Sequence, residues 1–223
     1  MGRDGGDDDE VPAHQVSVPG FEINRTEVTV GQYQRCVAAG KCLSPGTGPR
    51  CNWEVAGRGE HPVNCLAWEH AEAFCAWAGG ALPTEAQWEF AARSGGKAQP
   101  YPWGELPADC QRAVMPDDKG PGCGQDATAP ACSRPRGNSA HGLCDLSGNV
   151  WEWVADCWHK GYRGAPVDGS AWTTACKDPG RRVVRGSSFL NGTVDNLRAA
   201  SRDSSPAAER YHSIGFRCVR VGP

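Results

Sequence analysis

The chain has 223 residues and a formal net charge of −3, so it can form one sizeable domain, and neither sign of charge has the excess typical of binding to nucleic acid or to an anionic membrane. No run of apolar residues is long enough to span a bilayer, so we expect no direct membrane insertion. The 29 glycines and 17 prolines, against 2 methionines, indicate a loop-rich fold whose core consists of aromatic and small residues.

The first 13 residues are acidic and contain no apolar stretch of the kind found in a secretory signal peptide. We expect residues 1–13 to form a disordered, solvated tail and residues 14–223 to form a single domain. If the protein is exported, its signal segment is absent from this chain.

The 12 cysteines are even in number, and none belongs to a C-x-x-C pair, which argues against a zinc knuckle or a thioredoxin-like redox site. Disulfide bonds explain them better than the alternative, buried thiols in a cytosolic protein, because cross-links stabilise a loop-rich fold. Disulfides favour an exported location, whether periplasmic, cell-surface or extracellular. From proximity along the chain we expect Cys157 to pair with Cys176, and local pairs within 36–65 and within 110–144.

The first elements of the chain are predicted from its hydrophobic pattern. Residues 14–29 alternate apolar and polar positions, as in a strand with one buried face, and are broken at Pro19. A helix begins after Thr29, because apolar residues recur at helical spacing until Gly40. Residues 41–61 have no periodicity and predict a long loop.

Two further helices are predicted before residue 100. One covers 68–78, where apolar residues fall on one face before two glycines. The other begins after Thr84, whose side chain can cap the helix while Gln87 bonds back in a capping box. The remaining predicted elements are a long surface loop at 104–140 and two short strands at 181–186 and 214–220.

Residues 142–153 gather turn-forming glycines, carboxylates, an asparagine and two tryptophans in a stretch that we expect to be too irregular for a helix or strand. Carboxylate and carbonyl oxygens that converge from one loop are the ligands of calcium, so the stretch is a candidate cation site. The alternative is a buried aromatic turn with a capping asparagine.

Eight short motifs follow one another in the order found in a known family: NRTEVT at 24–29, HPVN at 61–64, CAWAGG at 75–80, LPTEAQWEFAAR at 82–93, YPWG at 101–104, GNVWEW at 148–153, RGSS at 185–188 and GFRC at 215–218. Over about residues 16–220 the chain resembles the formylglycine-generating enzyme, or sulfatase-modifying factor, family. The resemblance implies an α+β fold of the C-type lectin type, loop-rich and disulfide-rich, with few helices and small antiparallel sheets.

The resemblance also implies a calcium site in the 142–153 stretch. Asp145 and Glu152 match side-chain ligands, and Gly148 and Val150 match backbone carbonyl ligands. Hard oxygen donors on closely spaced positions agree with calcium chemistry, and we expect the ion to have a structural role.

The chain departs from the family where the family's enzymes carry their chemistry. Those enzymes bind copper through two cysteines, which are soft ligands for Cu(I). Asn191 occupies the place of the first cysteine and Val194 lies near that of the second, so we expect no copper and no activity of this type. A family disulfide is retained, by resemblance, as Cys75 to Cys218.

The segment 202–217 resembles the end of the variable region in the variable proteins of diversity-generating retroelements. Short polar and aromatic side chains of this kind make adaptable contacts at low entropic cost, so we expect them to bind a protein or other surface ligand. The predicted binding face, near Trp151, consists of Trp151, Phe189, Asn191, Thr193, Asp195, Asn196, Asp203, Ser204, Tyr211, His212 and Ser213. The alternative is an ordinary polar loop surface.

Three functions therefore compete. The favoured one is a non-catalytic ligand-binding protein, whose C-terminal surface varies if it belongs to a retroelement. The second is a structural or accessory domain of an exported protein. The third is an oxidoreductase of the formylglycine-generating type with a rearranged site.

Overall fold

The computed structural model describes residues 1–176, 178–190 and 193–221. Its three longer helices are α1 (Val30–Ala38), α2 (Trp68–Trp77) and α3 (Glu85–Ala92), as predicted. Thr29 and Thr84 each accept a hydrogen bond from the backbone of a glutamine three residues on, and the glutamine side chain bonds back. Two capping boxes therefore determine where α1 and α3 begin.

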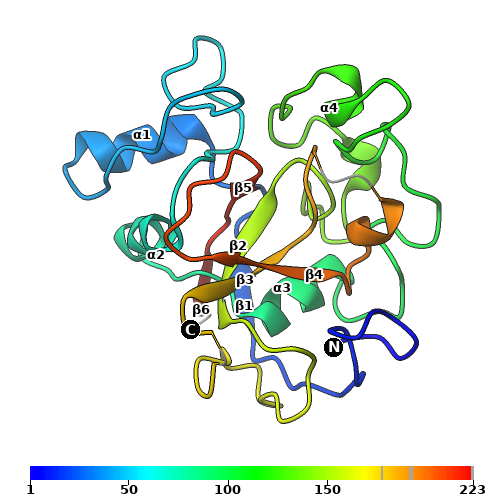
Figure 1. Cartoon of the computed structure of the whole chain (residues 1–223). Coiled ribbons are helices and arrows are strands. Elements are labelled where there is room, and N and C mark those ends of the chain that lie inside the picture. Colours follow the sequence, from blue (N-terminus) through cyan, green and yellow to red (C-terminus); the bar gives the residue numbers. More distant parts are fainter. Residues whose placement is uncertain (177, 191–192, 222–223) are drawn as a thin grey trace.

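The strands form two small sheets (Figure 1). The larger has the order β4 (Arg202–Pro206), β3 (Arg181–Arg185), β2 (Trp151–Cys157), β5 (Ile214–Gly215), and β5 runs parallel to β2. The smaller pairs β1 (Phe21–Ile23) with β6 (Val219–Val221) in antiparallel register. The expectation of small antiparallel sheets is thus right for every strand pair except β2 with β5.

Strand β2 is buried on both faces. Trp151 and Trp153 pack into a core with α1 and α2, whereas Val154 packs into a second core with Trp88 and Leu146. Successive side chains of a strand point to opposite faces, so a strand between two cores shows no alternation of polar and apolar residues. For this reason the prediction that residues 142–153 contain no strand is wrong from Trp151 onward.

Two other strand predictions are also wrong in part. Of the stretch 14–29 only β1 forms, and of 214–220 the chain forms two short strands in different sheets. Between β5 and β6 the chain crosses from one sheet to the other, and the Arg217 side chain reaches Glu152 of β2 there. A crossing of this kind interrupts pairing although the sequence remains apolar.

The rest of the described chain is irregular and cross-linked. It contains three short helical turns, α4 (Pro121–Gly124), η1 (Pro135–Gly137) and η2 (Val194–Leu197). All 12 cysteines form disulfides, in the pairs Cys36–Cys42, Cys51–Cys65, Cys75–Cys218, Cys110–Cys123, Cys132–Cys144 and Cys157–Cys176. The two named pairings and the local pairs within 36–65 and 110–144 are confirmed.

The N-terminal segment is not a solvated tail. Glu10 is completely buried and forms an ion pair with Arg198 at 2.7 Å, and the Asp9 carbonyl accepts a hydrogen bond from Arg202 at 3.0 Å. The backbone N–H of Gly2 donates to Glu89 of α3 at 2.8 Å. The prediction of disorder for 1–13 is wrong because its acids meet arginines from the far end of the chain.

Among the described residues no helix has both the length and the apolar character needed to cross a membrane.

Candidate functional site

The loop that precedes β2 is held by contacts with distant segments. Gly148 donates its backbone N–H to the Gly186 carbonyl at 2.7 Å, and Asn149 donates to the Val114 carbonyl at 2.8 Å. A Cβ on Gly148, whose φ is +87°, would lie 2.6 Å from the Val114 oxygen, so a larger residue does not fit there. The Asn149 side chain accepts from the Ala129 N–H at 3.0 Å. The Asn149 side chain therefore anchors the loop by hydrogen bonds, as expected for the alternative of a buried aromatic turn.

Three buried carboxylates and one buried guanidinium gather at this loop, and we call Glu27, Asp145, Glu152 and Arg217 the loop cluster. Arg217 donates to both oxygens of Glu152, at 2.7 Å from Nε and 2.6 Å from Nη2. Trp88 Nε1 donates to the same carboxylate at 2.9 Å. The charge of Glu152 is therefore balanced by a residue of the chain itself.

The other two acids of the loop cluster, Glu27 and Asp145, receive no hydrogen bond from an arginine among the described residues. Burial, together with the charge of Asp145, raises the pKa of Glu27 well above its usual range. Asn149 Nδ2 donates to Glu27 Oε1 at 2.9 Å, whereas Oε2 receives no N–H or hydroxyl donor among the described residues, and the neighbouring group that can share a proton with Glu27 is the Asp145 carboxyl. Burial also raises the pKa of Asp145, whose Oδ2 accepts from the Cys132 N–H at 2.6 Å. When all three acids are ionised, negative charge exceeds positive charge.

These observations fit a hard cation at Glu27 and Asp145, and they do not favour one at Glu152. The unsatisfied, buried Glu27 Oε2 is an acceptor that a cation would satisfy, since oxygen ligands of this type suit calcium. Asp145, Gly148, Val150 and Glu152 remain a prediction as the ligand set. Glu27 is an additional acid that the sequence analysis missed, although it belongs to the NRTEVT motif at 24–29.

A histidine and two cysteines also lie close together, at the end of β2 and in the loop after it. Cys157, His159 and Cys176 place ligand atoms within 4.8 Å of one another, the only group of three or more His, Cys, Asp or Glu that does so in the described part of the chain. Both sulfurs belong to one disulfide, and a disulfide sulfur is not the thiolate that metals bind. His159 stacks on Trp172 with ring centroids 3.5 Å apart, so the group is a packing feature.

The second candidate site is the C-terminal turn, which we define as Tyr211, His212 and Ser213. Its three carbonyls accept hydrogen bonds from the scaffold: Tyr211 from Cys65 N–H at 3.1 Å, His212 from Asn64 Nδ2 at 2.6 Å, and Ser213 from Trp151 N–H at 2.8 Å. These bonds fix the backbone of the turn, and the Tyr211 side chain is 44% exposed. Asn64, in the HPVN motif, is a second residue that the sequence analysis missed.

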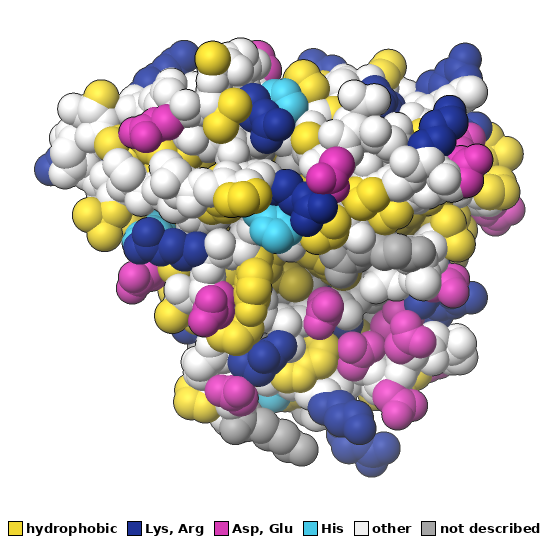
Figure 2. All heavy atoms as spheres, turned by 45° about the horizontal axis from the view of Figure 1, so that its top comes forward, with side chains coloured by type: hydrophobic (Ala, Val, Ile, Leu, Met, Phe, Trp, Pro, Cys, Tyr) yellow, Lys and Arg dark blue, Asp and Glu magenta, His cyan; other side chains and the backbone are white. Residues whose placement is uncertain are grey.

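Charged and aromatic neighbours surround His212. Its ring lies 6.3 Å from that of Phe189, and its Nε2 is buried without a hydrogen-bond partner among the described residues. Burial, and then the positive charge of Arg50, lower the pKa of His212. Arg50 itself forms a 2.7 Å ion pair with Asp126. In Figure 2 the face toward the viewer carries both signs of charge with apolar side chains between them.

The structure does not bring the predicted binding residues onto one face. Asp203 and Ser204 lie on β4, at the opposite edge of the sheet from β5, and Ser204 accepts hydrogen bonds from Arg181 (Figure 1). Thr193, Asp195 and Asn196 lie at η2, where Asp195 is 3.9 Å from Arg198. No hydrogen bond, ion pair or ring contact in the described ranges links either group to the C-terminal turn. The prediction of a single face is therefore wrong for Asp203 and Ser204, and it stays a prediction for the residues at η2.

Two predicted aromatic contacts are also corrected. Trp151 is 3% exposed because it belongs to the core below the sheet, and Phe189 is completely buried. They support the C-terminal turn from beneath, and neither presents a ring to solvent. Asn191 lies outside the described residues. Val194 is 47% exposed.

Comparison with known proteins defines first the fold and then the family. Among solved structures, PvdO from Pseudomonas aeruginosa aligns over 100% of this chain and 90% of its own, with a TM-score of 0.83 and 30% identity. Treponema denticola variable protein 1 aligns over 94% of this chain and 87% of its own, with a TM-score of 0.69 and 20% identity, which shows the fold alone. The loop-rich α+β fold of the C-type lectin type is thus confirmed.

Residues 1–221 match the sulfatase-modifying factor enzyme 1-like domain, and the chain belongs to this family. The formylglycine-generating enzyme of Streptomyces coelicolor is 36% identical over 178 residues, which is 74% of this chain and 54% of the enzyme. The cattle protein named inactive C-alpha-formylglycine-generating enzyme 2 is 34% identical over 168 residues, 72% of this chain and 50% of that protein. The chain spans about half the length of these two relatives.

Proposed function

We propose that this protein is a non-catalytic ligand-binding module built on the formylglycine-generating enzyme scaffold. One observation carries the proposal: all 12 cysteines are joined in disulfides, so the oxidised protein offers no thiolate to copper. The sequence agrees, since Asn191 and Val194 stand where the resemblance expects the copper cysteines. The name of the cattle relative supports the idea that this scaffold also serves without catalysis.

The C-terminal turn is the proposed binding surface. Tyr211 combines a large, partly exposed ring with a hydroxyl group, and its backbone is fixed by Cys65, so little entropy is lost when it binds. The Arg50–Asp126 pair, whose charges act on the neighbouring His212, supplies donors and acceptors close to the turn. A surface of mixed polarity with a rigid aromatic residue suits a protein or another surface ligand.

The proposal includes an exported location and a structural calcium ion. Six disulfides support an exported protein, because such bonds persist in oxidising compartments. Calcium bound at Glu27 and Asp145 would supply positive charge and fix the loop before β2, which carries Trp151 beneath the C-terminal turn. Diversification by a retroelement rests on the C-terminal sequence; a reverse transcriptase gene and an adenine-differing template repeat beside the gene would support it, and their absence would refute it.

The experiment compares binding with catalysis on the same protein. We expect an array of immobilised peptides and glycans to retain ligands that Tyr211→Ala loses and that Asp203→Ala, a change of an exposed residue at the far edge of the sheet, retains. We also expect no oxygen uptake when copper and a cysteine-containing peptide are added. Copper-dependent oxygen uptake that requires this peptide would contradict the proposal and favour the oxidoreductase with a rearranged site.

A further inference from the structure

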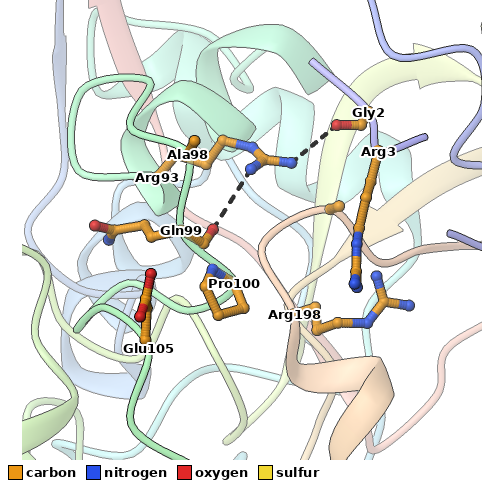
Figure 3. A pocket seen from close by; sticks show the side chains of 9 residues that line it. Gly2, Arg3, Arg93, Ala98, Gln99, Pro100, Glu105 and Arg198 are labelled. Atoms are coloured by element: carbon orange, nitrogen blue, oxygen red, sulfur yellow. Dashed lines mark hydrogen bonds between the residues drawn. The ribbon is translucent and has the colours of Figure 1, made fainter. Parts of the chain in front are cut away.

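A cavity of about 430 Å³, none of whose lining residues belongs to the C-terminal turn, lies between residues 2–3, 93–105 and 198–200 (Figure 3). Its volume falls in the range of about 300–1,000 Å³ typical of small-molecule sites. The lining includes Arg3, Arg93, Gln99, Pro100, Glu105 and Arg198. Its walls come from three segments far apart in sequence, so only the folded domain forms it.

One side of this cavity carries two guanidinium groups. Arg198 is 7% exposed and donates from Nη1 to Glu10 at 2.7 Å and from Nη2 to Asp7 at 3.3 Å. Its Nε lies 3.9 Å from the Asp195 carboxylate, so three acids of the chain already pair with Arg198. Figure 3 shows the exposed Arg3 side chain reaching toward Arg198. Because Arg198 is paired with acids of the chain, Arg3 is the guanidinium on this side that can pair with a bound anion.

The Arg3 guanidinium is available for such an anion. No hydrogen bond or ion pair holds its side chain within the part of the chain that the structure describes. A guanidinium presents a rigid fork of N–H donors that matches the two oxygens of a carboxylate. Arg93, by contrast, donates from Nε to Glu89 at 2.8 Å, from Nη1 to the Gln99 carbonyl at 3.4 Å and from Nη2 to the Gly2 carbonyl at 3.0 Å. Arg93 therefore forms a wall.

The other side of the cavity carries a carboxylate. Glu105 is exposed, lies across the cavity from Arg3 in Figure 3, and forms no ion pair or hydrogen bond with any described residue. Between the two charged sides lies the apolar ring of Pro100. Opposite charges that face one cavity without pairing are complementary to a ligand with a negative and a positive end.

We propose that this cavity binds a zwitterionic ligand of the α-amino acid or short-peptide class. Arg3 binds its carboxylate, and Glu105 binds its ammonium group. A multiply charged anion such as phosphate is disfavoured by Glu105, and a simple cation is disfavoured by Arg3. The site is distinct from the proposed binding surface at Tyr211.

The test is calorimetric titration of the full chain with the dipeptide L-alanyl-L-alanine, its N-acetylated form and its C-terminal amide. Loss of one charged hydrogen bond corresponds to a drop in affinity of about tenfold or more, so we expect each capped peptide to bind at least that much more weakly. Arg3→Gln abolishes the preference for the free carboxylate, and Glu105→Gln abolishes the preference for the free ammonium group. Both side chains are exposed, so neither change threatens folding.

Matched controls separate this site from the rest of the protein. Arg35→Gln on α1 and Glu72→Gln on α2 change exposed residues of the same types outside the cavity lining and leave dipeptide binding unchanged. Tyr211→Ala also leaves it unchanged, whatever its effect on the proposed binding surface. The inference is overturned if the free dipeptide shows no saturable binding at about 10 mM, if the capped peptides bind equally well, or if inorganic phosphate binds while the dipeptide does not.

Discussion

Two buried charge clusters lie on either side of Trp88, and they differ in balance. The loop cluster contains three acids and one arginine, and the α3 cluster, defined as Glu85, Glu89, Arg185 and Arg202, contains two of each. Trp88 Nε1 donates to Glu152 of the loop cluster, and Arg185 of the α3 cluster lies 5.2 Å from the centre of the Trp88 ring. The same aromatic side chain thus borders both.

The α3 cluster is neutralised within the chain. Arg202 donates to both oxygens of Glu85, at 2.8 and 2.7 Å, and Arg185 lies 2.6 Å from Glu89. Burial alone would raise the pKa of Glu89, but Arg185 and Arg93 lower it below its usual value. In the loop cluster burial raises the pKa of Glu27 instead. A buried acid with an arginine stays ionised, whereas one without requires a proton or a metal ion.

The largest effect is expected when the loop cluster loses its only arginine. Arg217→Met leaves Glu152 buried with Trp88 as its one remaining side-chain donor, and we expect the free energy of unfolding to fall by about 3–5 kcal/mol. Urea unfolding with the disulfides intact measures this, with the exposed Arg35→Met as the control. A loss below about 1 kcal/mol would mean that the cluster is not a charged unit.

A smaller effect is expected when each cluster loses an acid, and the loss of stability should differ between the two clusters. In a metal chelator we expect Glu89→Gln to lower the free energy of unfolding by about 1–3 kcal/mol, because two arginines lose their charged partner. Glu27→Gln should cause no loss, because it removes surplus negative charge and its amide can still accept from Asn149. Equal losses in the two variants, measured by urea unfolding, would show that the clusters are alike.

The pH dependence of stability follows from the raised pKa values. Burial raises the pKa of Glu27 and Asp145, and it raises the pKa of Asp156, beside Glu85, to about 7. Between the usual carboxyl pKa and neutrality the folded protein keeps protons that the unfolded chain has released. Stability in chelator should therefore fall as pH rises through this window, by at most about 1.4 kcal/mol per pH unit for each retained proton.

Urea midpoints between pH 4 and pH 7 measure this dependence. Excess calcium should remove the part that comes from Glu27 and Asp145, since a bound cation replaces the proton, and should leave the part that comes from Asp156. Stability that rises with pH across the window in chelator would contradict the assignment.

Local signals made part of this structure predictable. The capping boxes at Thr29 and Thr84 lie within four consecutive residues each, and the Cys157–Cys176 bond joins neighbours along the chain. The Cys75–Cys218 bond spans 143 residues and was predicted only through the family resemblance. Strand β2 escaped prediction because both of its faces are buried.

The charge partners were not predictable, because they join distant segments. Glu27 meets Asp145 and Asn149 only in the folded chain, and Glu10 meets Arg198 in the same way. In sequence both glutamates look like ordinary solvated charges. The predicted binding face failed for a topological reason, since β4 and β5 are both close to the C-terminus but form opposite edges of one sheet.

The most direct test of the loop cluster as a cation site is the melting temperature in excess calcium and in chelator. For a site saturated about 100-fold above its dissociation constant, binding adds about 2.7 kcal/mol, which corresponds to about 5–10 °C for a domain of this size. We predict that chelation lowers the melting temperature of the unmodified chain by about this amount and barely changes that of Glu27→Gln. An identical melting temperature of the unmodified chain in both buffers would contradict the account and would leave Glu27 and Asp145 as protonated acids beside an aromatic turn.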